Sequence, residues 1–240
     1  MDITKVTRVA RKALPLKYCG AVIVAAGSAE RMKGIDKILA PLTGEPVIVR
    51  TVRAFQACDA IREIVIVTRE DLILPISDLC NELDKVRAVV VGGDSRQSSV
   101  MAGLNALSKD VELVAVHDGA RPLVSWQVID RVVRAANTYG AAIPAVPVKD
   151  TVKEVAGGVV KQTPERRALC AIQTPQVFDF DLLRGALKKA EAEGVEVTDD
   201  SAAVEYIQMS VKVVPGDERN LKITTPLDLK LAEVILEAVL

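Results

Sequence analysis

The sequence predicts an α/β fold with a mostly parallel sheet and helices on both faces. Short apolar runs rich in β-branched residues alternate with segments of helical spacing, as in βαβ units. The polar residues suited to chemistry follow the apolar runs, and in an open α/β sheet ligands bind outside the carboxyl ends of the strands. The pattern therefore predicts both the sheet and the edge of it that binds a ligand.

Composition limits the classes of function. The chain has 240 residues, 50% hydrophobic and 26% charged, which is typical of a soluble globular protein. Its 31 basic and 32 acidic residues favour no nucleic-acid partner, and no apolar run reaches the ~20 residues of a membrane span. The cysteines are scattered without a CxxC pair, and with one histidine the usual zinc ligands are missing. A reduced, cytoplasmic protein is the simplest interpretation.

The first strand is predicted over Ala21–Ala25, a buried apolar run. Ala26–Ala29 follows with almost no side-chain bulk to keep a ligand off the backbone. Arg31 and Lys37 then supply a planar fork and a point charge, two geometries that hold phosphate oxygens. The segment is typical of a strand that runs into a phosphate-binding loop.

The alternation continues along the chain. Helical spacing predicts helices over Val47–Ala57, Asp71–Leu83 (interrupted by Pro75), Ser98–Leu107, Ser125–Tyr139, Phe180–Glu193, Asp200–Ile207 and Thr225–Leu240. Apolar runs predict strands over Glu63–Thr68, Val86–Val91, Glu112–Val116, Ala141–Val148 and Val211–Val214. The two prolines of Ala141–Val148 indicate an edge strand or an exit from the sheet.

The alternation stops at Lys149–Ile172, where Gly157-Gly158 separates two short alternating runs. This pattern predicts a β-hairpin arm that projects from the body. A lone hairpin is marginally stable in water, so we expect it to pack on a second subunit of a homodimer, with Arg166 on the returning segment able to reach a phosphate. The predicted organisation is an N-terminal extension over 1–18 and a single domain over 19–240 that carries the arm.

Candidate site residues follow the later strands in the same way. They are Gly92, Gly93, Asp94 and Ser99 after the third strand, Asp118 and Arg121 after the fourth, and Lys222 after the last. Taken singly, each has an ordinary alternative as a strand-end turn, a surface ion pair or a helix cap. His117 is predicted to be a hydrogen-bonded wall residue rather than a catalyst. Asp199-Asp200 is expected to cap a helix rather than bind a metal.

Several motifs together carry a resemblance. They are AAGSAERM, VVGGDSRQSSVMAGL, VHDGARPLV, IPAVPVKDTVKEV, QTPQVF, TDDSAAVE and NLKITTPLDLKLAE, in order from about Gly20 to Glu233. The sequence resembles the 2-C-methyl-D-erythritol 4-phosphate cytidylyltransferase family of the non-mevalonate isoprenoid route, with VHDGARP, TPQ and TDD the most specific motifs. The resemblance implies a Rossmann-like nucleotidyltransferase fold, CTP and Mg²⁺ as co-reactants, a sugar-alcohol phosphate as acceptor, and a homodimer with interlocking arms.

The resemblance also implies residue roles. Arg31 and Lys37 would stabilise the transition state, while Lys222 and Arg166 would position the sugar phosphate, Arg166 from the partner subunit. The nucleotide would be bound at Ala25, Ala26, Gly27, Gly93, Asp94 and Ser99. The acceptor would be bound by Asp118, Arg121, Arg166, Thr198 and Lys222. The metal ligands are unknown, with Asp118 and Asp217 as weak candidates.

The chain departs from the family pattern at Ala29, where a second glycine is usual, and at Asp36, where a proline precedes the lysine. The spacing from Arg31 to Lys37 is also one residue shorter than the pattern. A non-catalytic nucleotide-binding protein therefore stays open. A ribitol 5-phosphate cytidylyltransferase stays open as well, because it would share nearly all of these motifs. A dinucleotide-binding oxidoreductase is less favoured, because the first loop lacks G-x-G-x-x-G.

Overall fold

The structure is a computed structural model that describes residues 15–27 and 36–238. Its centre is an eight-stranded sheet in the order β10-β7-β11-β6-β1-β4-β5, with β12 paired to β7 beside this path. The strands are β1 (Cys19–Val24), β4 (Glu63–Thr68), β5 (Val86–Val91), β6 (Leu113–Asp118), β7 (Ala141–Pro147), β10 (Cys170–Ile172), β11 (Gln176–Asp179) and β12 (Lys212–Pro215). β1 pairs in parallel with β4 and β6, and β4 with β5, whereas β10 and β11 run antiparallel to their neighbours. The predicted mostly parallel sheet is confirmed.

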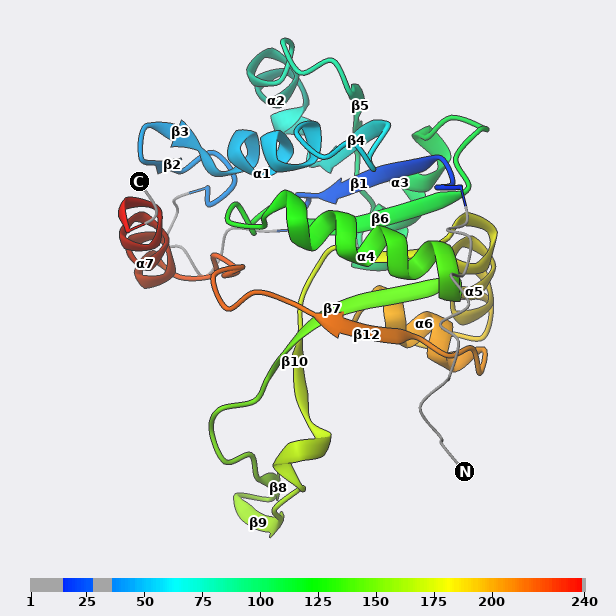
Figure 1. Ribbon diagram of the computed structural model, residues 1–240, viewed down its shortest axis with the longest axis vertical. Helices are drawn as coiled ribbons and strands as arrows, with labels where there is room; N and C mark the ends of the chain where they lie inside the picture. The colour runs from blue at the N-terminus through cyan, green and yellow to red at the C-terminus, as the bar shows by residue number, and fades with distance from the viewer. Residues whose placement is uncertain (1–14, 28–35, 239–240) are drawn as a thin grey trace, which may run out of the picture.

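Helices cover both faces of the sheet, with α1 and α4 on one face and α3, α5 and α6 on the other (Figure 1). The helices in the described part of the chain are α1 (Val47–Gln56), α2 (Ile73–Leu79), α3 (Arg96–Ala106), α4 (Trp126–Tyr139), α5 (Phe180–Ala192), α6 (Asp200–Tyr206) and α7 (Pro226–Glu237). The alternation along β1 explains the two layers, because Ala21 and Ile23 join the core under α1 and α4 while Val22 joins the core under α3.

Most of the predicted elements are confirmed within one or two residues, and β4 and β5 have the predicted bounds. The predicted start of α7 is also confirmed, since the Thr225 hydroxyl and the Asp228 carboxylate form a reciprocal capping box. Pro75 does not interrupt a helix as expected. It is the third residue of α2, in the first turn, where its missing N–H breaks no helical hydrogen bond.

β7 corrects one expectation, because its prolines do not place it at an edge. It pairs with β12 as well as with β10 and β11. Pro144 has no N–H to donate, but its carbonyl accepts from Gln173 N at 2.8 Å. The alternative expectation, an exit from the sheet, is the one confirmed: β7 leads into the arm and β10 returns from it.

Three strands or strand pairs have no counterpart in the sequence prediction. They are the short hairpin of β2 (Pro41–Leu42) and β3 (Glu45–Pro46), β10, and β11 within QTPQVF. The helix pattern also missed two short 3-10 turns, η2 (Glu70–Leu72) and η3 (Arg166–Ala168).

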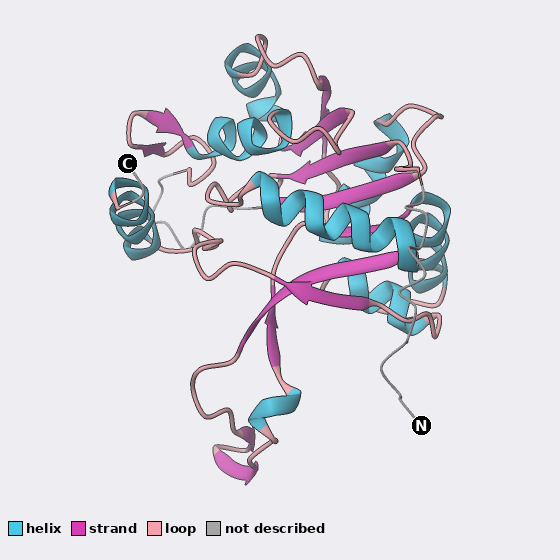
Figure 2. Cartoon of the chain, viewed as in Figure 1, coloured by secondary structure: helices cyan, strands magenta, loops and turns pink. Residues whose placement is uncertain are grey.

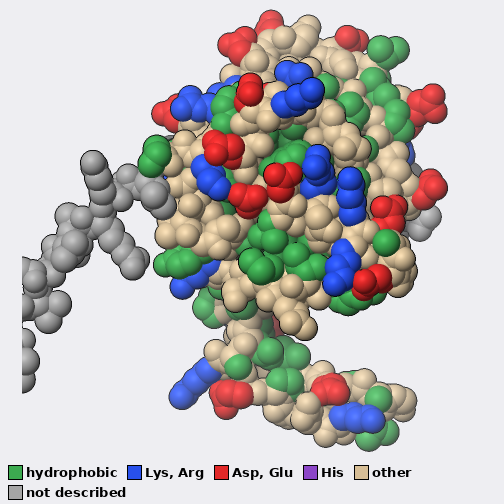
Figure 3. All heavy atoms as spheres, turned by 90° about the vertical axis from the view of Figure 1, so that its right-hand side faces the viewer, with side chains coloured by type: hydrophobic (Ala, Val, Ile, Leu, Met, Phe, Trp, Pro, Cys, Tyr) green, Lys and Arg blue, Asp and Glu red, His purple; other side chains and the backbone are tan. Residues whose placement is uncertain are grey.

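The arm projects from the body and ends in the hairpin of β8 (Glu154–Ala156) and β9 (Val159–Gln162) (Figure 2). Both glycines of the predicted turn have positive φ, +58° at Gly157 and +76° at Gly158, a conformation that favours glycine. Every residue of β8 and β9 is exposed. Figure 3 shows the end of the arm as a lobe joined to the body by a narrow neck.

The described residues contain no helix that combines the length and the apolar character needed to cross a membrane. Most of the predicted N-terminal extension, residues 1–14, lies outside the described part of the chain.

Candidate functional site

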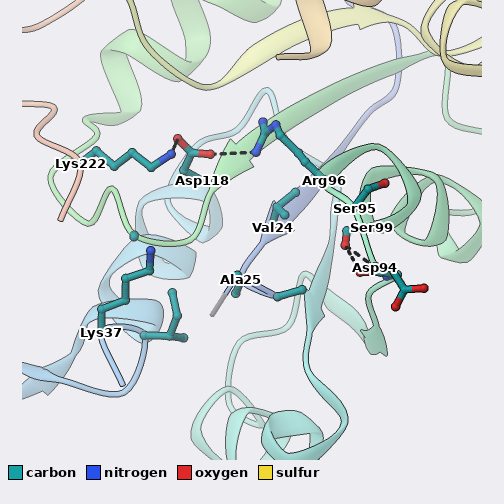
Figure 4. A pocket seen from close by; sticks show the side chains of 14 residues that line it. Val24, Ala25, Lys37, Asp94, Ser95, Arg96, Ser99, Asp118 and Lys222 are labelled. Atoms are coloured by element: carbon teal, nitrogen blue, oxygen red, sulfur yellow. Dashed lines mark hydrogen bonds and ion pairs between the residues drawn. The ribbon is translucent and has the colours of Figure 1, made fainter. Parts of the chain in front are cut away.

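A pocket of about 460 Å³ opens at the carboxyl edge of β1, β5 and β6. Figure 4 shows Lys37, Arg96, Asp118 and Lys222 arranged around it. Most of the predicted nucleotide-binding and catalytic residues line it. They are Ala25, Ala26, Gly27, Lys37, Gly93, Asp94, Ser99 and Lys222, and Asp118, predicted to bind the acceptor, lines it as well. Segments up to about 200 residues apart in the sequence therefore meet in one cavity, as the strand-end rule predicts.

A second, smaller pocket of about 180 Å³ holds the other predicted acceptor residues, Arg121 and Thr198. It shares Arg96, Asp118 and Lys222 with the larger pocket. These three side chains therefore lie between the two cavities, where groups bound in each would come together.

The two positions directly after β5 are glycines, Gly92 and Gly93, and side chains from α3 approach both closely. A Cβ atom on Gly92 would lie 2.7 Å from Ser99 Oγ, and one on Gly93 would lie 2.3 Å from Ser98 Oγ. Gly93 N donates to Ser99 Oγ at 3.2 Å, so the hydroxyl has a defined position at the pocket wall. The start of α3 is capped by Ser95, whose side chain accepts from Ser98 N.

Asp118 ends β6 and contacts three cations. Its Oδ1 accepts from Arg96 at 3.0 Å, and its Oδ2 lies 3.2 Å from Arg121 Nε and 3.1 Å from Lys222 Nζ. Burial alone would raise the pKa of Asp118, but Arg96, Lys222 and Arg121 outweigh it and hold that pKa well below its usual value. The carboxylate is therefore ionised and gathers positive charge at the strand end.

Arg96 is the charged residue of the site that the sequence prediction missed. Besides Asp118, its guanidinium donates to Asp200 Oδ2 at 2.7 Å. Asp200 is 2% exposed, and burial raises its pKa while Arg96 opposes the rise. Asp199, in contrast, caps α6 by accepting from Ala202 N, as expected for this pair.

His117 is a wall residue, as predicted, and its hydrogen bonds define its tautomer. Nε2 faces the carbonyl oxygen of Arg121 at 3.2 Å and must donate, so Nδ1 accepts from the Thr174 hydroxyl at 3.0 Å. Thr174 Oγ1 in turn accepts from Asp118 N at 3.1 Å. Burial lowers the pKa of His117 to about 3, so the ring is neutral at physiological pH. It connects the turn after β6 to the loop before β11.

The loop that carries Lys222, residues 217–222, is joined to the segment Gln173–Gln176. Gln173 Nε2 donates to Asp217 O at 2.8 Å, and Asn220 Nδ2 donates to Thr174 O at 2.9 Å. Arg121 Nη1 donates to Asn220 O at 2.8 Å. The backbone of the loop that carries Lys222 is thus held by hydrogen bonds between side chains and main-chain carbonyls.

Asp36, one of the departures from the family pattern, has partners for both oxygens. Oδ2 pairs with Arg69 Nη2 at 2.6 Å and Oδ1 accepts from Ile38 N at 3.0 Å. Arg69, which the sequence prediction did not single out, also reaches Gly27 O at 3.5 Å. It therefore contacts both described residues that flank the segment 28–35.

Two predicted catalytic residues are not among the described residues that line these pockets. Arg31 and the variant position Ala29 lie outside the described residues. Arg166 lies on the exposed arm, where it donates to Lys149 O at 2.9 Å and lines a separate cavity. One subunit therefore does not bring Arg166 to the site.

The weak metal candidates have other partners. Both oxygens of Asp118 contact cations, and hydrogen bonds from Arg219 lower the pKa of Asp217. Within residues 15–27 and 36–238, no group of three or more His, Cys, Asp or Glu side chains could hold a metal ion. The described residues therefore do not fit a metal centre built by the protein alone.

The sequence is similar to known proteins along most of its length. A model of the 2-C-methyl-D-erythritol 4-phosphate cytidylyltransferase family matches residues 19–238. An enzyme of that name from Symbiobacterium thermophilum is 47% identical over 218 residues, which cover 90% of this chain and 92% of the relative. Another from Caldanaerobacter subterraneus subsp. tengcongensis is 44% identical over 225 residues, which cover 90% and 97%.

Solved structures agree with the sequence comparison. The 4-diphosphocytidyl-2C-methyl-D-erythritol synthase of Anaerococcus prevotii superimposes with a TM-score of 0.84 at 35% identity, covering 92% of this chain and 96% of that one. The 2-C-methyl-D-erythritol 4-phosphate cytidylyltransferase of Thermus thermophilus gives a TM-score of 0.78 at 33% identity, covering 92% and 99%. The chain belongs to the 2-C-methyl-D-erythritol 4-phosphate cytidylyltransferase family.

Proposed function

We propose that this protein transfers CMP from CTP to 2-C-methyl-D-erythritol 4-phosphate, giving 4-diphosphocytidyl-2-C-methyl-D-erythritol and pyrophosphate. One observation supports this most strongly. The loop backbone at Ala25–Gly27, the Lys37 side chain and the cluster of Asp118 and Lys222 line a single pocket at the strand edge. Backbone at a strand end together with cations is suited to a triphosphate and a phosphate monoester.

The reaction needs no nucleophile from the protein. An oxygen of the acceptor phosphate forms a bond to the α-phosphorus of CTP, and the bond from that phosphorus to the pyrophosphate oxygen breaks. Because a phosphate monoester is largely ionised near neutral pH, it needs no strong base. The only histidine fits this scheme, since both ring nitrogens of His117 have partners in the wall.

The chain contributes position and charge. Lys37 and Arg31 would stabilise the charge that develops as pyrophosphate leaves. Lys222 would hold the acceptor phosphate, with Arg121, Thr198 and Asp118 around its polyol. The slot beside Gly93 and Ser99 would accept the cytosine, whose exocyclic amine can donate where the oxygen of UTP cannot.

Mg²⁺ also belongs to the proposal, as an ion that enters with the triphosphate of CTP. Magnesium sites often combine substrate phosphates with few protein ligands, which agrees with the occupied carboxylates of Asp118 and Asp217. When bound, the ion would neutralise phosphate charge. Pyrophosphate release should stop when EDTA is added and resume with excess Mg²⁺.

We further propose an active homodimer joined by the arm. Every residue of β8 and β9 is exposed in one subunit, and Val155 and Val159 are 54% and 68% exposed. Arg166 on the same arm would reach the partner's acceptor phosphate. A cytoplasmic location is proposed as well, on the ground that all four cysteines are free thiols.

A pyrophosphate-release assay tests the function. CTP, UTP and ATP are each combined with 2-C-methyl-D-erythritol 4-phosphate and with ribitol 5-phosphate. Turnover should be highest for CTP with the methylerythritol phosphate. Preference for ribitol phosphate would assign the acceptor differently, equal use of UTP would contradict the cytosine slot, and CTP binding without turnover would indicate a non-catalytic protein.

A further inference from the structure

Arg96 is the first residue of α3, and its side chain lies between two carboxylates from other elements. Nη1 donates to Asp118 Oδ1 at 3.0 Å and Nη2 donates to Asp200 Oδ2 at 2.7 Å. Asp118 is the last residue of β6 and Asp200 the first of α6. One guanidinium therefore connects α3, β6 and α6 beside the pocket. Figure 4 shows its contact with Asp118.

The contact determines how the Asp118 carboxylate is turned. Because Arg96 takes Oδ1, Oδ2 faces Arg121 and Lys222, at 3.2 Å and 3.1 Å. Lys222 has a long side chain that is 42% exposed, so its ammonium needs a fixed partner to occupy one place. The Arg96 guanidinium donates to Asp118 with one nitrogen and to Asp200 with the other. It therefore fixes the orientation of Asp118 better than the single ammonium of a lysine would.

We propose that Arg96 is a positioning residue for cytidylyl transfer: it orients Asp118 so that the Lys222 ammonium lies where the acceptor phosphate binds. The inference rests on the proposed function and adds to it a residue that acts on the reaction through another side chain. Both outer nitrogens of Arg96 contact carboxylates, so these contacts connect it to Asp118 and, through Asp118, to Lys222.

A purely structural role is the competing explanation, because Asp200 is 2% exposed and a buried carboxylate without its partner is costly. Arg96→Gln alone would confuse the two roles. The double variant Arg96→Gln/Asp200→Asn separates them, since it removes both members of the buried pair and leaves the net charge of the chain unchanged. Asp118, Arg121 and Lys222 all remain in it.

We expect the double variant to fold and to lose roughly 10- to 100-fold in kcat/KM, the size of effect that follows from a misplaced reacting group. KM for the methylerythritol phosphate should rise and kcat should fall, while the calorimetric Kd for CTP stays within about twofold, a change of under ~0.5 kcal/mol. With one cation fewer beside it, the pKa of Asp118 should rise from its depressed value. The matched control is Asp130→Asn/Arg134→Gln, an exposed pair on α4 whose removal should leave the kinetics unchanged.

Wild-type kinetics in the double variant would overturn the proposal and leave Arg96 as the counter-ion of Asp200. Weakened CTP binding with an unchanged KM for the acceptor would also overturn it. Should the double variant fail to fold, Arg96→Lys keeps the charge but replaces the fork with one ammonium. It should show the same changes to a smaller degree, and wild-type kinetics in it would contradict the proposal.

Failure of the proposed function would be visible separately, as absence of turnover in the wild-type protein. Inorganic phosphate then serves as the probe, with its affinity measured by calorimetry. Weaker phosphate binding in the double variant than in the wild type supports the positioning role, and equal binding overturns it.

Discussion

The strand-edge site and the arm are built in opposite ways. At the site, Asp118 contacts three cations and His117 has a partner for each ring nitrogen, so the groups hold one another in place. On the arm, the hairpin exposes Val155 and Val159, and β7 and β10 form its base, where Lys149 also pairs with Glu218 of the body. The contrast agrees with the proposed homodimer, in which one subunit would preorganise the charged groups of the strand-edge site and a second subunit would supply what the arm lacks.

The largest effect should come from the site. Lys37→Ala should lower kcat by roughly 10²-fold or more, the usual effect of removing one preorganised donor that stabilises charge. Arg31→Ala is expected to act in the same direction. Steady-state kinetics with a circular dichroism melt measure activity and folding together, and Lys189→Ala on α5 is the surface control. Near-wild-type kcat in Lys37→Ala would assign the role to another lysine.

Mixed dimers test whether the arm completes the partner's site. Arg166→Ala and Lys37→Ala chains should each be nearly inactive. Random exchange in equal amounts gives half heterodimers with one intact site each, so about a quarter of wild-type activity should return. Subunit exchange is verified by mass spectrometry of tagged chains. If exchange is complete and no activity returns, Arg166 does not act across the interface.

Two exposed apolar residues of the arm, Val155 and Val159, can be changed without touching the body. Val155→Asp/Val159→Asp should weaken the dimer at least ~10-fold, because a charge buried in the interface would lose its water. Sedimentation velocity measures the change, and the body should melt as before. The matched control is Val155→Thr/Val159→Thr, which keeps the strand-favouring shape. A dimer of unchanged affinity in the aspartate variant would mean that another surface joins the subunits.

The smallest predicted effect concerns the wall of the site. The pKa of His117 is about 3 when folded and near 6.5 when unfolded, so the unfolded chain binds the extra proton between these values. Stability should therefore fall as pH drops below about 6.5, by at most ~1.4 kcal/mol per pH unit from this residue. Urea unfolding between about pH 5 and 7 measures the slope. His117→Gln should flatten it, and an unchanged slope would contradict the buried neutral ring.

The sequence predicted the strands and the edge of the sheet because both follow from local patterns. β4 (EIVIVT) and β5 (VRAVVV) are mostly apolar and rich in β-branched residues, Asp118 ends a strand, and Gly93 and Lys222 follow strands. β11 was missed because only two of its four residues, in QVFD, are apolar, and its pairing with β6 and β7 is not local. Arg96 was missed because an arginine among serines at a helix start is typical of a solvated surface. Its burial depends on Asp200, 104 residues away.

The loop of residues 217–222 has a consequence for the thermodynamics of binding. Asn220 N donates to Asp217 O at 3.0 Å and Ile223 N donates to Ala120 O at 2.8 Å, while Asn220 is 1% exposed. These amides are protected before any substrate arrives, so hydrogen exchange at Asn220 and Ile223 should already be slow in the unliganded protein. Capture of an anion by Lys222 then orders one side chain rather than a loop, and little of the binding enthalpy is offset by lost backbone entropy.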